Sequence, residues 1–144
     1  MNMTPALLFY LARQYDRAIE VLRKLIDMEQ NFPAAHSVLG NAYAQAGMYE
    51  HGMAEYQKVL ELSKGVTVVE TAIKAIIAHA YARWGKRAKA TKLLDEVTRA
   101  IGTGVCVSSY SIAGVYAALG QSEPAFEWLN KAYEQHDLQL VSVK

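Results

Sequence analysis

The chain has 144 residues, 52% of them hydrophobic and 20% charged, which gives it enough apolar surface for one folded domain. Fifteen Lys and Arg against fourteen Asp and Glu leave a formal charge of +1, so no global field points to nucleic acid or to an anionic membrane. The single cysteine, Cys106, excludes an internal disulfide framework.

The apolar run at residues 6–12 begins the chain's first helical pattern. It is too short to cross a bilayer and has no basic stretch before it, so we expect neither a signal peptide nor a membrane span. We therefore expect a cytoplasmic chain, although a chain with so few cysteines also fits the periplasm.

A spacing of small and aromatic residues in the stretch 33–66 recurs on both sides of it. The positions of Gly40, Tyr43 and Gly47 are taken again by Ala78, Tyr81 and Gly85 and by Ala113, Tyr116 and Gly120. Upstream, Phe9 and Tyr15 take the positions of Tyr43 and Tyr49. The repeat is about 34 residues long. It divides a single domain, 1–144, into units at about 1–32, 33–66, 67–104 and 105–138, followed by a tail at 139–144.

Within each unit the apolar residues return at helical spacing, which predicts two helices per unit. The expected helices are 5–12, 15–29, 33–46, 49–62, 68–84, 87–101, 106–119 and 122–136. Gly47, Gly85 and Gly120 separate three of the pairs, where glycine can adopt the positive φ that ends a helix, while Arg13 stands in the corresponding place of the first unit.

Short turns make the two helices of a pair antiparallel. A distance of about 8–10 Å between their axes requires small residues where the axes approach. The candidates for these contacts are Ala18, Gly40, Gly52, Ala78, Ala90, Ala113 and Ala125.

With this register, Leu39-Gly40, Tyr43, Gly47 and Tyr56 resemble the tetratricopeptide repeat. The resemblance implies an all-α, right-handed α-solenoid of about four helix-turn-helix repeats that binds peptides or helices on a concave surface. Two departures stand out in the best-formed unit, since His36 occupies the place of an early Trp and Gly52 replaces the usual Ala.

The last unit and the tail are similar to the closing repeats of bacterial multidomain regulators. This likeness implies that the chain is part of a larger regulatory protein. Four apolar residues of the tail are then the start of a further element: Leu138, Leu140, Val141 and Val143.

The concave surface is lined mainly by the first helix of each unit. Its predicted peptide-binding residues are Ser37, Asn41, Gln45, His79, Arg83 and Tyr110. Because the lining is small and weakly polar, with alanine and valine at positions where the family places cations for a carboxylate, we expect an apolar or amphipathic peptide. Asn41 would bond to its backbone. For His79 the simpler alternative is a partly exposed, hydrogen-bonded histidine.

Residues 83–92 hold five basic residues and no acid. Lys86 and Arg87 lie at an expected helix N-terminus, where the macrodipole disfavours a cation by about 0.3–1 kcal/mol. This placement predicts an acidic partner near Lys86–Lys92, and a solubilising outer face is the alternative. We expect no nucleic acid, because the run is short and no aromatic ladder interleaves it.

The remaining motifs favour no chemistry. The histidines lack the spacing of a zinc site, and the stretch 102–104 has neither the strand nor the Lys-Ser/Thr of a phosphate loop. Six acids on the second helices fit a solvated face: Glu20, Glu50, Glu55, Glu61, Glu127 and Glu134. We expect no metal site and no cofactor, and we do not expect the chain to be an enzyme.

Two alternatives to the binding scaffold stay open. The first unit lacks a complete partner helix for five apolar residues, which predicts self-association into a homo-oligomer: Leu7, Leu8, Phe9, Tyr10 and Leu11. An enzyme with an unrecognised site is the weaker alternative.

Overall fold

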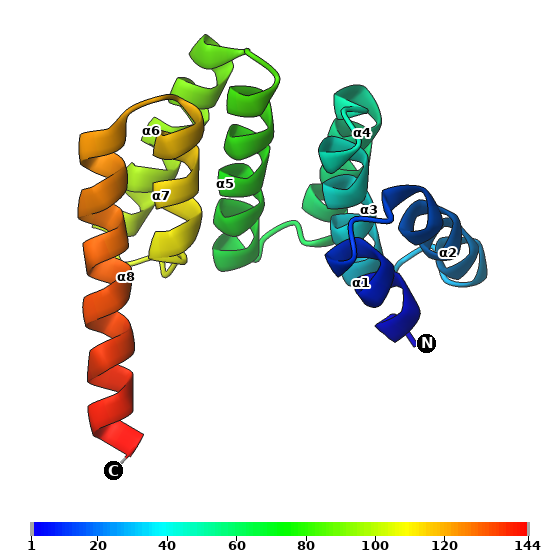
Figure 1. Ribbon diagram of the computed structural model, residues 1–144, viewed down its shortest axis with the longest axis horizontal. Coiled ribbons are helices and arrows are strands. Elements are labelled where there is room, and N and C mark those ends of the chain that lie inside the picture. Colours follow the sequence, from blue (N-terminus) through cyan, green and yellow to red (C-terminus); the bar gives the residue numbers. More distant parts are fainter. Residues whose placement is uncertain (1, 144) are drawn as a thin grey trace. The chain divides into compact units, whose positions relative to one another are not determined.

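The computed structural model describes residues 2–143, with side chains for residues 2–135. Within that range it is all-α and contains no strand. The helices are α1 (Thr4–Leu11), α2 (Tyr15–Met28), α3 (Pro33–Gln45), α4 (Tyr49–Leu62), α5 (Thr67–Arg83), α6 (Arg87–Gly102), α7 (Ser109–Ala118) and α8 (Ser122–Val143). Consecutive helices pack in pairs, so the predicted all-α repeat architecture is confirmed (Figure 1).

The chain forms two compact units, Met1–Val66 and Thr67–Lys144. In the first unit α1 packs on α2, α2 on α3 and α3 on α4. In the second unit α5 packs on both α6 and α7, and α7 packs on α8. The boundary between the units falls at the end of the predicted 33–66 repeat, whereas the division into four repeats stays a prediction.

Two helix boundaries differ from those expected from the sequence. The seventh helix begins at Ser109 rather than at residue 106, because Ser108 takes the non-helical backbone conformation of an N-cap residue. The eighth helix continues to Val143 rather than ending at 136. The side chains of His136 and of the apolar tail residues lie outside the described part of the chain.

Each hairpin turn ends its first helix with the same pair of backbone hydrogen bonds. At the α3–α4 turn the N–H of Gly47 donates to the carbonyl of Ala44, and the N–H of Met48 donates to Tyr43, at 3.1 and 2.8 Å. This pattern requires a left-handed residue, and Gly47, Gly85 and Gly120 have φ of 81°, 85° and 77°. Arg13 takes the equivalent place with φ 61°, although it has a side chain.

Two glycines lie where α3 and α4 approach each other closely. A Cβ on Gly40 would lie 2.6 Å from a ring carbon of Tyr56, and a Cβ on Gly52 would lie 3.0 Å from the carbonyl oxygen of Gly40. The buried ring of Tyr56 packs against Gly40, and glycine at position 52 lets the backbone of α4 approach the backbone of α3. This contact explains why Gly52 replaces the alanine of the family's pattern.

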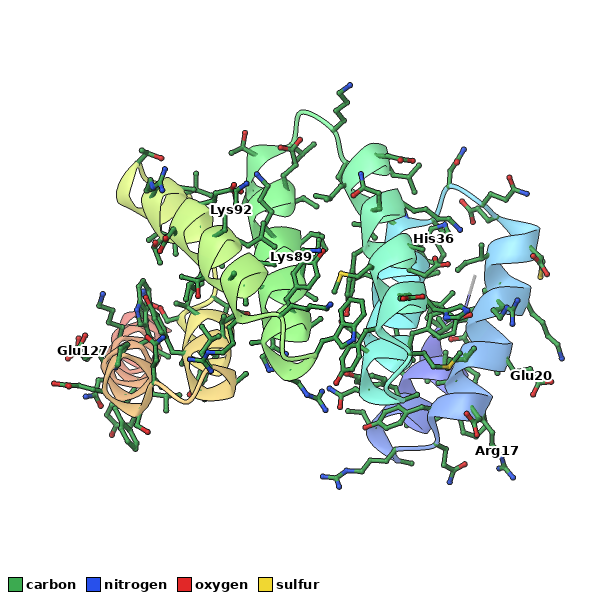
Figure 2. The ribbon with its side chains drawn as sticks, turned by 90° about the horizontal axis from the view of Figure 1, so that it is seen from above. Arg17, Glu20, His36, Lys89, Lys92 and Glu127 are labelled. Carbon is green, nitrogen blue, oxygen red and sulfur yellow. The ribbon has the colours of Figure 1, made fainter. Side chains whose placement is uncertain are left out.

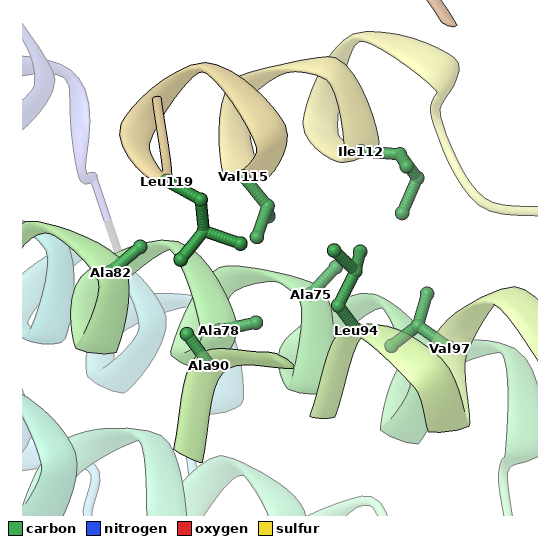
Figure 3. Close-up of a cluster of buried hydrophobic side chains, with 9 residues drawn as sticks. All are labelled: Ala75, Ala78, Ala82, Ala90, Leu94, Val97, Ile112, Val115 and Leu119. Carbon is green, nitrogen blue, oxygen red and sulfur yellow. The ribbon is translucent and has the colours of Figure 1, made fainter. Parts of the chain in front are cut away.

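Each unit has its own hydrophobic core. In the first, Ala18, Leu22 and Leu39 are buried where α1, α2 and α3 meet. In the second, three residues from each of α5 and α6 pack against Ile112, Val115 and Leu119 (Figure 3). The residues predicted from their small size to lie at helix contacts are all buried: Ala18, Gly40, Gly52, Ala78, Ala90, Ala113 and Ala125.

Candidate binding surfaces

The first candidate surface lies on α3, where Ser37, Asn41 and Gln45 are spaced four residues apart and so share one face. The hydroxyl of Tyr56 donates a 2.6 Å hydrogen bond to Oδ1 of Asn41. This bond uses the carbonyl end of the side-chain amide, so the NH₂ end is the part of Asn41 that can donate to a peptide carbonyl.

The second candidate surface lies in the second unit, along the seam between α5 and α7. His79 of α5 faces Gly114 of α7, where an added Cβ would lie 3.7 Å from Cδ2 of the imidazole. Burial of His79 and then the positive charge of Arg83, one turn further along α5, lower the pKa of the imidazole below its ordinary value of 6.5. At neutral pH His79 is therefore uncharged and offers one donor and one acceptor.

Tyr110 lies on α7 one turn before Gly114, and 62% of its surface is exposed. It thus stands beside the same seam as His79 and Arg83, with the side-chain-free position of Gly114 next to it. The six residues predicted to bind a peptide fall into two sets of three, one on α3 of the first unit and one on the α5–α7 seam of the second.

The basic run from Arg83 to Lys92 is exposed at each of its five cations. Lys86 lies at the N-cap of α6, and the first turn of α6 holds no acid, whereas the first turns of four other helices each contain one. The rings of Tyr81 and Trp84 stack nearly in parallel, with their centroids 6.1 Å apart. Sequence reasoning missed these rings, although their spacing of three residues, across the end of α5, indicated a shared face.

His36 and Glu55 form a buried pair that sequence reasoning did not predict (Figure 2 labels His36). Nδ1 of His36 lies 2.6 Å from Oε2 of Glu55, and Nε2 lies 2.8 Å from the backbone carbonyl of Gln30. The placement of Glu55 on a solvated face was therefore wrong, because the residue is only 9% exposed. The sequence signal was the histidine at the place of a tryptophan, since a polar ring in a core position requires a buried partner.

Lys58 also approaches this pair, with its Nζ 3.4 Å from Oε1 of Glu55. Among the residues with described side chains, no group of three or more His, Cys, Asp or Glu is placed to hold a metal ion. In that same part of the chain every buried polar side-chain atom has a hydrogen-bond partner.

No helix in the described range is long and apolar enough to cross a membrane. A search of curated proteins finds no match to the chain.

Residues 33–65 match the family described as Tetratricopeptide repeat. This range begins with α3, ends after α4 and includes the close approach at Gly40 and Gly52. It also coincides with the repeat predicted at 33–66. The helix pair α3–α4 is therefore a tetratricopeptide repeat within this chain.

Proposed function

We propose that the chain is a non-enzymatic scaffold that binds a peptide or helix of another protein through the faces of its first helices. The tetratricopeptide repeat suggests a role in protein–protein interaction. The observation that carries the proposal further is the seam between α5 and α7, where an exposed aromatic ring and a half-buried imidazole flank a position without a side chain.

The chemistry of this seam favours an apolar or amphipathic segment. The ring of Tyr110 offers apolar area at a small cost in conformational entropy, as aromatic anchors do in protein interfaces. The absence of a side chain at Gly114 lets the imidazole of His79 lie close to α7, and the neutral imidazole can donate to or accept from a ligand backbone. In the first unit the NH₂ group of Asn41 would serve the same purpose.

The test is a pull-down from the source lysate, followed by titration of the purified partner with variants of the full chain. Tyr110→Ala and His79→Ala should each weaken binding about 5- to 30-fold, the range of interface anchors. Tyr133→Ala is the matched control, because Tyr133 lies on α8 of the same unit and is 64% exposed. It should bind like wild type.

The α3 face is tested by Asn41→Ala, read together with thermal stability because this change also removes the acceptor of the Tyr56 hydroxyl. Weaker partner binding by a variant that is still folded is the expected result. If Asn41→Ala and Tyr110→Ala both bound the partner as wild type does, the assignment to first-helix faces would fail.

Self-association is a second candidate function. Three leucines of α1, Leu7, Leu8 and Leu11, are 41%, 61% and 75% exposed, which leaves apolar surface that a second copy could cover. Sedimentation velocity across a concentration series should then show a sedimentation coefficient that rises with concentration. A variant combining Leu8→Gln and Leu11→Gln should abolish this rise. A strict monomer at the highest concentration rules this candidate out.

We further place the chain as a module of a larger bacterial regulatory protein in the cytoplasm. The support is the likeness of the last unit to the closing repeats of such regulators. The genomic context tests it, since a DNA-binding or catalytic module encoded in the same reading frame is the expected result. The partner is also expected to be acidic near Lys86–Lys92.

A further inference from the structure

We infer that the α5–α6 turn is a second docking surface, which binds a short acidic segment of the partner protein. This inference rests on the proposed protein-binding function and names the chemistry of one of its contacts. We call the surface the basic ridge, and it consists of Tyr81, Trp84, Lys86, Arg87, Lys89 and Lys92.

The four cations of the basic ridge form no ion pair in the described part of the chain. No Asp or Glu occurs in residues 71–94, and no described ion pair includes Lys86, Arg87, Lys89 or Lys92. By contrast, Lys74 of α5 reaches Oε2 of Glu96 at 3.6 Å. Four exposed cations of one sign within seven residues repel one another, and an anionic ligand would relieve that repulsion.

Two of these cations are held against aromatic rings. The ammonium group of Lys86 lies 5.1 Å from the ring centroid of Trp84, and that of Lys89 lies 5.6 Å from the centroid of Tyr81. The two rings are stacked with an interplanar angle of 3°. Since these contacts restrict long, flexible side chains before a ligand arrives, less conformational entropy is lost on binding.

The size of the basic ridge favours a peptide over a nucleic acid. From Lys86 to Lys92 the axis of α6 rises about 9 Å, which is the length of about three extended residues (Figure 2 labels Lys89 and Lys92 on α6). A duplex is held by about 6–10 phosphate contacts. Asp95 and Glu96 follow on the same helix and would repel a longer polyanion. The ridge therefore fits a segment with two to four consecutive carboxylates.

The experiment uses the full chain and a fluorescein-labelled Gly-Ser peptide with four consecutive glutamates, followed by fluorescence anisotropy. The counterpart peptide carries four glutamines. The chain should bind the glutamate peptide, more weakly as salt rises, and the glutamine peptide at least about tenfold more weakly. A variant combining Lys86→Gln, Arg87→Gln, Lys89→Gln and Lys92→Gln should lose at least about tenfold in affinity for the glutamate peptide.

Two further variants separate the basic ridge from a general charge effect. Trp84→Leu keeps every cation and should weaken binding about 2- to 5-fold by releasing Lys86. Lys131→Gln is the matched control, because Lys131 lies 4.0 Å from the ring centroid of Trp128 in the same unit but outside the ridge. It should bind like wild type. Circular dichroism of each variant shows that the helices are retained.

The inference is overturned if both peptides bind equally, or if Lys131→Gln weakens binding as much as the four-residue variant does. It is also overturned if oligo(dT) or phosphatidylserine vesicles bind more tightly than the glutamate peptide and lose binding in the four-residue variant. If the isolated partner loses affinity with Tyr110→Ala but not with the four-residue variant, only the basic ridge fails. If affinity is lost in the four-residue variant but not in Tyr110→Ala, the basic ridge is supported and the α5–α7 seam is not a binding surface.

Discussion

The buried pair of His36 and Glu55 shows how one polar residue in a core position changes its surroundings. The imidazole is 3% exposed and faces two acceptors, the carboxylate of Glu55 and the carbonyl of Gln30. Both partners come from outside α3, so the pair joins this helix to α4 and to the chain that leads from α2. A tryptophan at the same place could fill the volume but could not bond to both acceptors.

We predict that His36→Ala lowers the free energy of unfolding by about 3–5 kcal/mol, because it removes the partner of Oε2 of the buried Glu55 and leaves only the half-exposed Lys58 at Oε1. Urea unfolding followed by circular dichroism measures the change. Lys58→Gln is the control, since Lys58 is 52% exposed and its contact with Glu55 should contribute only about 0–1 kcal/mol. Equal effects of the two substitutions would contradict the prediction.

His79 predicts a dependence of stability on pH. Its pKa is lowered in the folded chain by burial and by Arg83, so the unfolded chain binds the proton first as the solution is acidified. Stability attributable to His79 is thus retained above pH 6.5 and declines as the pH falls through the lower, folded-state pKa. Thermal unfolding of wild type and His79→Gln at pH 7.5 and 5.5 measures this effect.

The His79→Gln variant should lose less stability between pH 7.5 and 5.5 than wild type does. The other three histidines are present in both proteins, so their contribution cancels in the comparison. Identical losses in the two proteins would show that His79 does not have the inferred surroundings.

At the scale of the element, the hairpin turns are the most regular feature of the chain. Four turns share the same pair of backbone hydrogen bonds, and the residue in the left-handed conformation is glycine in three of them. The first turn makes these bonds with Arg13, whose N–H donates to Tyr10 at 3.0 Å. Backbone geometry therefore follows the repeat even where the favoured residue is missing.

Arg13→Gly should raise the free energy of unfolding by about 0.5–1 kcal/mol. The left-handed conformation costs a residue with a Cβ about 1–2 kcal/mol, and the greater freedom of glycine in the unfolded chain offsets part of the gain. Gly85→Ala is the opposite substitution and should lower the free energy of unfolding by about 1 kcal/mol. No atom lies within 4 Å of the added Cβ, so only the backbone conformation opposes the change. Urea unfolding that gives both variants the stability of wild type would refute this account.

At the scale of the whole molecule, the two compact units have separate hydrophobic cores. Leu22 lies in the first core and Leu94 in the second, both almost fully buried. In repeat proteins each unit contacts only its neighbours, so stability is local and segments can open independently.

Leu22→Ala and Leu94→Ala should therefore each lower the free energy of unfolding by about 2–5 kcal/mol, but each in its own unit of the chain. Native-state hydrogen exchange should show that Leu94→Ala lowers protection mainly in α5–α8, and Leu22→Ala mainly in α1–α4. The double variant serves as the additivity check. Uniform loss of protection along the chain in either single variant would mean that the two units unfold as one.

The sequence by itself determined the all-α class, the eight helices, the glycine turns and the small residues at helix contacts. These features depend on local periodicity and on backbone conformations that single residues favour or forbid. It also identified the exposed cations of residues 83–92. Helical spacing alone placed Ser37, Asn41 and Gln45 on a common face of one helix, and His79 and Arg83 on a common face of another.

Only the tertiary structure decided which side chains meet across helices. The pairing of His36 with Glu55, the bond from Tyr56 to Asn41 and the close approach of His79 to Gly114 each depend on the axial shift and rotation of two packed helices. Helical periodicity does not specify the axial shift or the rotation. The packing of the two helices at their smallest residues sets both. For that reason Glu55, an acid expected in solvent, is buried against α3, and the amide of Asn41, expected to bond to a ligand backbone, already accepts one hydrogen bond from Tyr56.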